Sequence, residues 1–214
     1  MSREIKIIIS IVIVIIGGII LSSEYIYSKK ISVYDYMNEL YYNIDDANTE
    51  EIDSVETDRV DNQDEAVGET SYKLNEVKDE SIYIGYLSIP DINLKKGFTT
   101  KESKYNTISK NIQILSASDY PDKENGNVIF AAHSGNSSVS YFNKLYLLSE
   151  GALVNVEYKN HIYTYKITYI YKVNKSGSIE IKSNKDKSNI TLITCTKNDN
   201  TTQTVYLGEL INKE

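Results

Sequence analysis

Residues 191–207 read TLITCTKNDNTTQTVYL and contain the only cysteine of the 214-residue chain, Cys195. An apolar, β-branched run precedes Cys195, and a second one follows a polar stretch. This pattern predicts two strands joined by a loop. A free cysteine usually packs as a small hydrophobe, but with a histidine elsewhere in the chain it is also a candidate nucleophile. Both interpretations stay open on this segment alone.

Further segments with strand character precede this pair. They are YIGYLSIPDINL (83–94), GNVIFAAH (126–133), ALVNVEY (152–158) and HIYTYKITYIYKV (161–173). Pro90-Asp91 breaks the first segment into two strands around a turn, and Lys159-Asn160 is the expected turn of a hairpin. About eight short strands separated by turn signals predict a mostly β fold, a closed or nearly closed barrel with short helices.

The remaining segments around these strands are expected to hold short helices and one long loop. We expect a helical segment within residues 104–115 and a helix over SYFNKLYLL (140–148) that ends before Gly151. Residues 174–189 are expected to form a loop that holds at most one short strand. Strand alternation places the following side chains on one face: Tyr163, Tyr165, Ile167, Tyr169 and Tyr171.

The segment IIISIVIVIIGGIILSS (7–23) carries no charge. As a helix it would be about 25 Å long, close to the thickness of a bilayer core. A cleaved signal peptide would have a shorter apolar stretch and an A-x-A-like site, and neither is evident. A buried core helix is rarely this long without polar interruption. We therefore interpret it as an uncleaved signal anchor, with the bulk of the chain outside the membrane.

A polar region follows the anchor. Residues 31–45 have the spacing of a short amphipathic helix. The stretch 45–70 is dominated by Asp, Glu, Asn and Thr and has few large apolar residues, which predicts a spacer. The sequence thus predicts the following organisation: 1–6 cytoplasmic, 7–23 transmembrane, 24–80 extracytoplasmic acidic spacer, and 81–214 the β domain.

Composition excludes several kinds of function. The net charge is −7 and the pI about 5.0, so a basic surface for nucleic acid is not expected. One cysteine forms no internal disulfide and no cysteine-based metal cluster, and two histidines do not make a His-rich metal site. The spacing of the acidic residues in the spacer matches no Ca²⁺-binding loop. We therefore expect no metal.

The two histidines differ in their surroundings. His133 ends an apolar strand and enters the polar SGNSSVS stretch, so it is expected at the rim of the barrel. His161 is expected at the tip of a hairpin, where an exposed histidine needs no role. A thiolate nucleophile requires a base or ion-pair partner. His133 is therefore the preferred partner of Cys195.

At this point four segments, in order, resemble one family. The chain from about residue 82 to 210 resembles a sortase, a membrane-anchored cysteine transpeptidase of Gram-positive cell surfaces. The segments are IGYLSIPDINL, GNVIFAAHSG with the following Phe142 to Leu145, GALVNVEY, and TLITC, which is very close to the family's T-L-x-T-C motif. Papain-like proteases place Cys before His, and the caspase Q-A-C-x-G motif is absent.

This resemblance implies a mechanism. Cys195 would attack the bond after Thr in a Leu-Pro-x-Thr-Gly-like C-terminal sorting signal of a secreted protein, giving a thioester. His133 would protonate the leaving amine, and an amine from a cell-wall precursor or a pilin lysine would resolve the thioester. Because the thioester conserves the energy of the peptide bond, no cofactor is required. The resemblance also assigns Thr194 and Ser134 to the substrate site and residues 174–189 to its border.

The chain departs from the family at one position. Sortases use an arginine on the strand after the cysteine, but Arg3 and Arg59 both precede the predicted barrel. The alignment places Gln203 there, and a shift of one residue would place Thr204. Gln donates a hydrogen bond but carries no charge. Loss of one oxyanion donor typically costs on the order of 10²–10³ in rate, and a neutral replacement should cost less.

Three hypotheses remain open. The first is an active sortase with Gln203 in the arginine position. The second is a catalytically weak sortase-like barrel that binds sorting signals or an assembly partner. The third is an unrelated anchored surface domain with a structural cysteine. Lys197 is a conceivable source of positive charge in the first, although it lies in a polar stretch. The class of sortase is not evident from the sequence.

Overall fold

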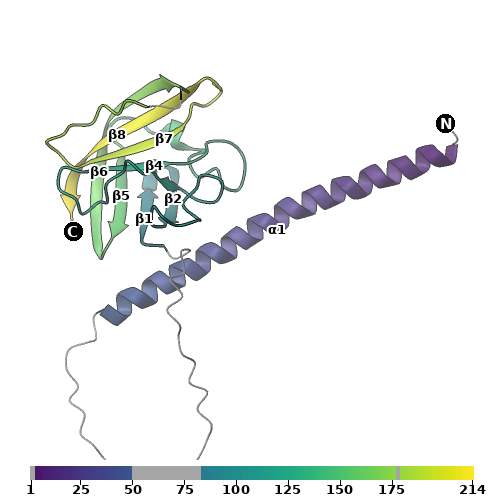
Figure 1. Cartoon of the computed structure of the whole chain (residues 1–214), viewed down its shortest axis with the longest axis horizontal. Helices are drawn as coiled ribbons and strands as arrows, with labels where there is room; N and C mark the ends of the chain where they lie inside the picture. Colours follow the sequence, from purple (N-terminus) through teal and green to yellow (C-terminus); the bar gives the residue numbers. More distant parts are fainter. Residues whose placement is uncertain (1–2, 50–82, 177–178) are drawn as a thin grey trace, which may run out of the picture.

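The computed structural model describes residues 3–49, 83–176 and 179–214. Eight strands form one curled sheet, and a long helix runs past it (Figure 1). The elements are α1 (Arg3–Thr49), β1 (Gly85–Ile89), η1 (Pro90–Ile92), β2 (Leu94–Phe98), β3 (Gln113–Ile114), β4 (Asn127–Ala131), η2 (Leu145–Leu147), β5 (Leu153–Tyr158), β6 (His161–Asn174), β7 (Asn189–Cys195) and β8 (Thr202–Lys213). The predicted mostly β, eight-stranded barrel with short helices is confirmed.

The strand order of the sheet is β2-β1-β5-β6-β8-β7-β4-β3. In this sheet β2 and β3 are the two edges, so the barrel is nearly rather than fully closed. Neighbouring strands pair antiparallel with one exception, the parallel pair of β4 and β7. Because parallel strands run in the same direction, the carboxyl ends of β4 and β7 lie at the same rim of the barrel.

Strand β7 is covered on both faces, which explains its unbroken apolar run. Ile190 and Leu192 point into the main core of the barrel. Ile193 points the other way, into a small outer cluster with Ile129 of β4 and Val205 of β8. This outer cluster is completed by partly buried neighbours, including two from the segment that precedes β7: Leu115, Ala131, Tyr171, Val173, Ile179 and Ile181.

The hairpin of β5 and β6 turns at Lys159 and Asn160, as predicted. Both residues have positive φ, 48° and 60°, the left-handed conformation required at the two central positions of a type I′ turn. Asn tolerates this region better than most residues. The turn fixes the register in which Tyr163 of β6 pairs with Val156 of β5.

The predicted single face of β6 is wrong beyond Ile167. Ile167 pairs with Gly208 and Tyr169 with Leu207, so one extra residue lies on β6 at a bulge. A bulge reverses the alternation of the strand after it. Tyr163 and Tyr165, before the bulge, are therefore buried in the core, whereas Tyr169 is 44% exposed and Tyr171 packs in the outer cluster.

Two predicted helices are absent. Residues 104–112 form turns, because the side chain of Asn106 donates to the carbonyl oxygens of Lys101 and Ile114 and accepts from the amide of Ile114. The segment 140–148 contains only turns and the three-residue η2. There the Phe142 amide donates to the carbonyl of His133 at 3.0 Å. No strand occurs in the described residues 175–176 and 179–188.

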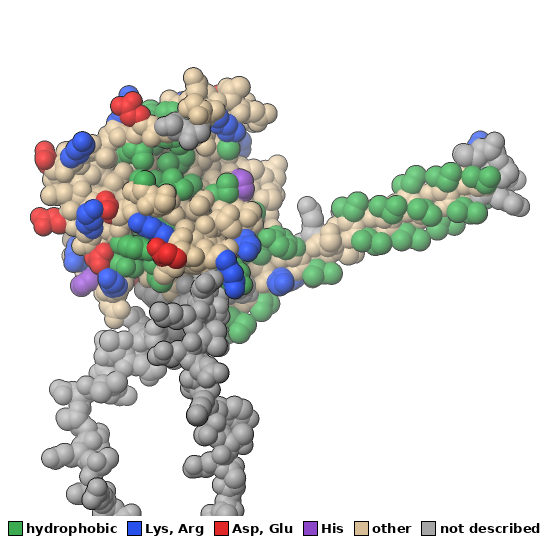
Figure 2. Space-filling model, in the orientation of Figure 1, with side chains coloured by type: hydrophobic (Ala, Val, Ile, Leu, Met, Phe, Trp, Pro, Cys, Tyr) green, Lys and Arg blue, Asp and Glu red, His purple; other side chains and the backbone are tan. Residues whose placement is uncertain are grey.

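Helix α1 is longer than predicted. The expected anchor and the expected amphipathic helix form one continuous 47-residue helix, which is about 70 Å long. In the described chain one helix segment is long and apolar enough to cross a membrane, Ile5–Met37. Apolar side chains line its N-terminal part, whereas charged side chains are distributed over the barrel (Figure 2). Of the predicted spacer, 24–80, residues 24–49 belong to α1 and residues 50–80 lie outside the described residues.

Helix α1 contacts the barrel through a partly buried ion pair, in which Lys96 is buried and Asp35 is 33% exposed. Asp35 of α1 accepts hydrogen bonds from the Lys96 Nζ of β2 and from the Tyr83 hydroxyl. Lys96 is only 5% exposed, and its Nζ lies 4.6 Å from the centroid of the Tyr141 ring. Burial lowers the pKa of Lys96, and the Asp35 carboxylate opposes this shift.

Candidate functional site

The register of β4 and β7 brings His133 and Cys195 to one rim. Ala131 pairs with Ile193 in the parallel ladder, an offset of 62 residues. The same offset separates His133 from Cys195, which both lie two positions further along. The ladder ends at Ala131 and Ile193, so His133 lies just beyond the end of β4, and Cys195 is the last residue of β7. The predicted pair is thus brought together by the parallel pairing.

Hydrogen bonds fix the two strand ends beside each other. The Ser134 hydroxyl donates to the carbonyl of Cys195 at 2.8 Å. The Thr194 hydroxyl donates to the carbonyl of Ala132, also at 2.8 Å, and Thr194 is only 5% exposed. Both residues predicted for the substrate site therefore hold the backbone of the rim. Neither contact tests their predicted role in binding a substrate.

A cleft of about 660 Å³ opens at this rim. It is lined by His133, Ser134, Gly135, Asn136, Asn143, Lys144, Tyr146, Lys175, Cys195, Thr196, Lys197, Asn198 and Asn200. Three lysines contribute to this lining, and Asn198 and Asn200 are neutral. Lys144 and Lys175 had no signal in the sequence, because they are near Cys195 only through the fold.

The β7–β8 register places Gln203 directly opposite Cys195. Side chains of directly opposed residues in an antiparallel pair lie on the same face. Thr204, the alternative position, pairs with Thr194 and shares a hydrogen bond of 2.8 Å with the hydroxyl of Thr196. Gln203 thus shares a face with Cys195 but does not line the cleft, whereas Thr204 lines a small pocket with Cys195 and Lys197. Both residues remain candidates for the position of the missing arginine.

Lys197 is held against an aromatic ring. Its Nζ lies 3.7 Å from the centroid of the Tyr146 ring, within cation–π range. Tyr146 and Lys197 both line the cleft with Cys195. A fixed ammonium group therefore lies in the same cleft as the thiol, although Lys197 is not on the strand where Gln203 lies.

The loop between β7 and β8 is closed by Asp199. Its carboxylate accepts hydrogen bonds from the Thr201 amide at 2.8 Å and from the hydroxyls of Thr201 and Thr202, each at 2.6 Å. These bonds hold the pKa of Asp199 well below its ordinary value of 3.8. They also position the loop that carries Lys197.

His161 lies far from Cys195 along the sheet. It begins β6, whereas Val173, which pairs with Gln203, is twelve residues further along that strand. Twelve residues of extended strand span roughly 40 Å. The His161 ring contacts the carbonyl of Glu214 at 3.2 Å through Nδ1 and does not line the cleft.

A sortase domain model matches residues 87–211, which is more than half of the chain. The chain belongs to the sortase family. Solved structures of sortases are similar to it as well. Sortase A of Listeria monocytogenes is 20% identical with a TM-score of 0.52, covering 62% of this chain and 89% of that chain. A comparison with curated protein sequences finds no match.

Two further sortases carry the same fold. Sortase C1 of Streptococcus agalactiae is 28% identical with a TM-score of 0.53, over 61% of this chain and 68% of that one. Sortase D5 of Clostridium perfringens is 24% identical with a TM-score of 0.53, covering 62% of this chain and 81% of that chain. Sortases of classes A, C and D are thus all similar to this one, and the class stays unresolved.

Family membership excludes one hypothesis and supports a general activity. The sortase is not an unrelated surface domain with a structural cysteine. The family implies a cysteine transpeptidase, and sortases are typically membrane-anchored, which agrees with the apolar helix α1. Among the described residues the only arginine is Arg3, at the start of α1, so no described arginine belongs to the barrel.

Proposed function

We propose that this sortase cleaves a Leu-Pro-x-Thr-Gly-like sorting signal through Cys195. The observation that carries the proposal is that His133 and Cys195 line one cleft, at the rim where β4 and β7 end beside each other. The Cys195 sulfur attacks the carbonyl carbon of the threonine. The C–N bond to glycine breaks, and the acyl group remains on sulfur as a thioester.

His133 supplies the proton for the leaving group. As imidazolium it donates this proton to the departing glycine amine, which leaves with the C-terminal fragment. A second amine then attacks the thioester and gives a proton to His133, so that the Cys195 thiolate, the His133 imidazolium and a new amide result. The acceptor is an amine of a cell-wall precursor or a pilin lysine. No cofactor enters this sequence.

Gln203 takes the place of the arginine in this proposal. Opposite Cys195 and on the same face, its side-chain amide donates a hydrogen bond to the substrate or to the developing oxyanion. Lys197, fixed on the Tyr146 ring, adds positive charge to the cleft. Arginine combines a charge with directed hydrogen bonds. In this proposal Gln203 supplies the hydrogen bond and Lys197 supplies the charge.

The location of the reaction follows from α1. We propose that residues 7–23 cross the cytoplasmic membrane once, with residues 1–6 in the cytoplasm and the barrel outside. Newly exported proteins and lipid-linked precursors meet at that surface. The relatives include a sortase C of Streptococcus pneumoniae described with a pilin substrate. Whether this sortase anchors proteins to the wall or joins pilins is decided by its acceptor.

The test is acylation of the full chain in detergent by a panel of sorting-signal peptides. Intact mass should reveal a hydroxylamine-sensitive adduct on Cys195 with one peptide. Cys195→Ala should abolish the adduct and His133→Ala should nearly do so, whereas His161→Ala is the matched control and should acylate normally. A large loss in His161→Ala would mean that the wrong histidine has been assigned.

The second candidate is a weak or inactive sortase that binds sorting signals or an assembly partner. The absence of arginine from the described barrel favours it. A peptide that binds the folded protein, with Cys195 open to alkylation but never acylated, would support this candidate instead.

A further inference from the structure

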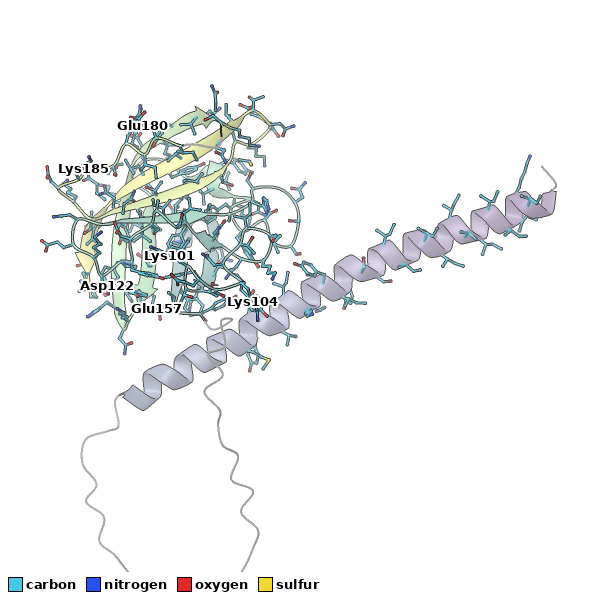
Figure 3. All side chains as sticks on the ribbon, in the orientation of Figure 1. Lys101, Lys104, Asp122, Glu157, Glu180 and Lys185 are labelled. Atoms are coloured by element: carbon cyan, nitrogen blue, oxygen red, sulfur yellow. The ribbon has the colours of Figure 1, made fainter. Side chains whose placement is uncertain are left out.

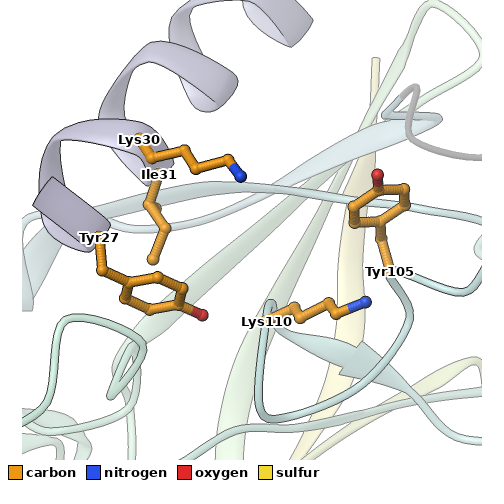
Figure 4. Close-up of a pocket in the computed structure, with 5 residues that line it drawn as sticks. All are labelled: Tyr27, Lys30, Ile31, Tyr105 and Lys110. Atoms are coloured by element: carbon orange, nitrogen blue, oxygen red, sulfur yellow. The ribbon is translucent and has the colours of Figure 1, made fainter. Parts of the chain in front are cut away.

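A cavity lies between α1 and the barrel. It has a volume of about 330 Å³ and is lined by Tyr27, Lys30 and Ile31 of α1 and by Tyr105 and Lys110 of the loop between β2 and β3. In Figure 4 Tyr27, Lys30 and Ile31 lie on one side of this space and Tyr105 and Lys110 on the other. None of these residues lines the cleft of Cys195. The volume is that of a small-ligand site.

The lining of this cavity is basic and aromatic. Lys30 and Lys110 contribute two ammonium groups, and among the described residues no carboxylate lines the space. Lys110 and Lys104 approach the Tyr105 ring, with Nζ at 4.9 and 5.4 Å from its centroid. Among the described residues neither Lys30 nor Lys110 pairs with a carboxylate. The cavity thus favours an anion with hydrogen-bond acceptors.

The depth of the cavity along α1 indicates where that anion comes from. The uncharged run ends at Ser23, so Tyr27 and Ile31 lie four and eight residues beyond it. At 1.5 Å per residue these positions are about 6 and 12 Å past the apolar segment. The headgroup layer of a bilayer is about 5–8 Å thick on each side. The cavity therefore begins within the headgroup layer.

We propose that this cavity binds the headgroup phosphate of an anionic glycerophospholipid. Lys30 and Lys110 flank the phosphate, the hydroxyls of Tyr27 and Tyr105 donate to its oxygens, and Ile31 contacts the glycerol. The net negative charge matters, because a zwitterionic headgroup brings its own cation to the two lysines. This proposal rests on the membrane anchor proposed above and not on the chemistry of Cys195.

Such a lipid would attach the barrel to the membrane surface. The loop between β2 and β3 would contact the bilayer through Lys110, while Asp35 and Lys96 join α1 to the barrel one turn further along the helix. Two attachments restrict rotation of the barrel about α1 more than one does. The lipid would thereby set the orientation of the barrel above the membrane.

Tryptophan quenching can measure the approach of this loop to the membrane, because the chain has no tryptophan. Ser109→Trp places a probe beside Lys110 in the full chain, reconstituted in phosphatidylcholine vesicles with or without phosphatidylglycerol. Lipids spin-labelled on the headgroup quench a nearby probe. We expect stronger quenching with phosphatidylglycerol, and we expect Lys110→Ala to lower the ratio of docked to free barrel about five-fold.

Lys185→Ala is the matched control, because Lys185 lies on the side of the barrel away from α1 (Figure 3). With Lys185→Ala, the tryptophan probe should be quenched as strongly as in the Ser109→Trp chain itself. With Lys110→Arg, quenching should still be stronger in vesicles that contain phosphatidylglycerol. Equal quenching in both lipid mixtures, with the chain floating with the vesicles, would overturn the lipid site but leave the anchor intact. A chain that does not float with either vesicle would overturn the anchor and this inference together.

A second measurement separates lipid from free phosphate. The full chain in neutral detergent is heated with a short-chain phosphatidylglycerol, with the matching phosphatidylcholine, or with inorganic phosphate. We expect only phosphatidylglycerol to raise the Tm, and we expect Lys30→Ala to remove that rise. An equal rise with inorganic phosphate would identify a site for the free anion and overturn the assignment to lipid.

Discussion

Gln203 is the residue that we propose in place of the family's arginine, and its position follows from strand register. It opposes Cys195 in the β7–β8 ladder and is flanked on the other side by Val173 of β6. A glutamine there donates a hydrogen bond without charge. We therefore expect Gln203 to assist acylation through the direction of its hydrogen bond and not through charge, and substitution of Gln203 should remove that hydrogen bond.

We expect Gln203→Ala to lower the acylation rate by roughly 10²–10³-fold, the usual cost of removing one neutral oxyanion-hole donor. Gln203→Arg should restore or raise the rate, because it returns both the fork of donors and the charge. Single-turnover acylation measured by intact mass provides the comparison. Thr204→Val tests the alternative position, since Thr204 lines a small pocket with Cys195 and its hydroxyl is bonded to Thr196. Unchanged kinetics in Gln203→Ala would remove this residue from the site.

At this scale the sequence predicts residues that carry a motif and misses those that do not. Cys195 and His133 are recognisable because each ends an apolar run that forms a buried strand. Lys144 and Lys175 also line the cleft, but they belong to irregular segments whose path depends on the whole barrel. No local pattern of charge or hydropathy distinguishes them from other surface lysines.

The loop between β7 and β8 is an element whose order depends on one carboxylate. Asp199 accepts three hydrogen bonds from Thr201 and Thr202, and these bonds hold its pKa below the ordinary value. A carboxylate with a lowered folded-state pKa stabilises the folded loop above the unfolded pKa. That contribution is lost as the pH falls from about 4 through the folded-state pKa.

We therefore expect the loop to remain ordered at neutral pH and to loosen only in strong acid. An NMR titration of the Asp199 carboxyl and the Thr201 and Thr202 amides would follow this change. Asp199→Asn should make the amide shifts of the loop independent of pH in the acid range. A carboxyl that titrates at its ordinary pKa of 3.8 would contradict the expected hydrogen bonds.

Among the elements, strands are predicted better than the segments between them. Alternation located β5 and β6 and their turn, but the bulge after Ile167 reversed the faces, and nothing in the sequence marks that position. The expected helix within residues 104–115 is absent because the Asn106 side chain satisfies backbone groups that a helix would have paired. Side-chain hydrogen bonds of this kind depend on tertiary structure.

At the scale of the molecule, the contact of α1 with the barrel depends on a buried charge. Lys96 is 5% exposed, and Asp35 is the carboxylate beside it. Breaking a buried pair by removing one partner leaves an uncompensated charge, whereas an apolar replacement of the buried partner is often neutral or stabilising. The two members of the pair should therefore respond differently to substitution.

We expect Asp35→Ala to destabilise the full chain in detergent by about 1–3 kcal/mol, because the Lys96 ammonium loses its acceptor. Lys96→Met should restore stability in the same background. Urea unfolding followed by circular dichroism measures both. Asp122→Ala is the control, because Asp122 binds the exposed Lys159 at 2.8 Å and should contribute about 0–1 kcal/mol. Equal losses in Asp35→Ala and Asp122→Ala would contradict this prediction.

The position of β8 between β6 and β7 also sets the order in which the enzyme can mature. Strand β8 follows β7 in the chain, so a ribosome makes it later, yet it must insert between two strands that were made earlier. Closing such distant contacts is slow. Until β8 has inserted, Cys195 has no Gln203 opposite it. If Gln203 acts as proposed, the thiol should gain its full reactivity only once β8 is in place, so that an incompletely folded barrel is not acylated.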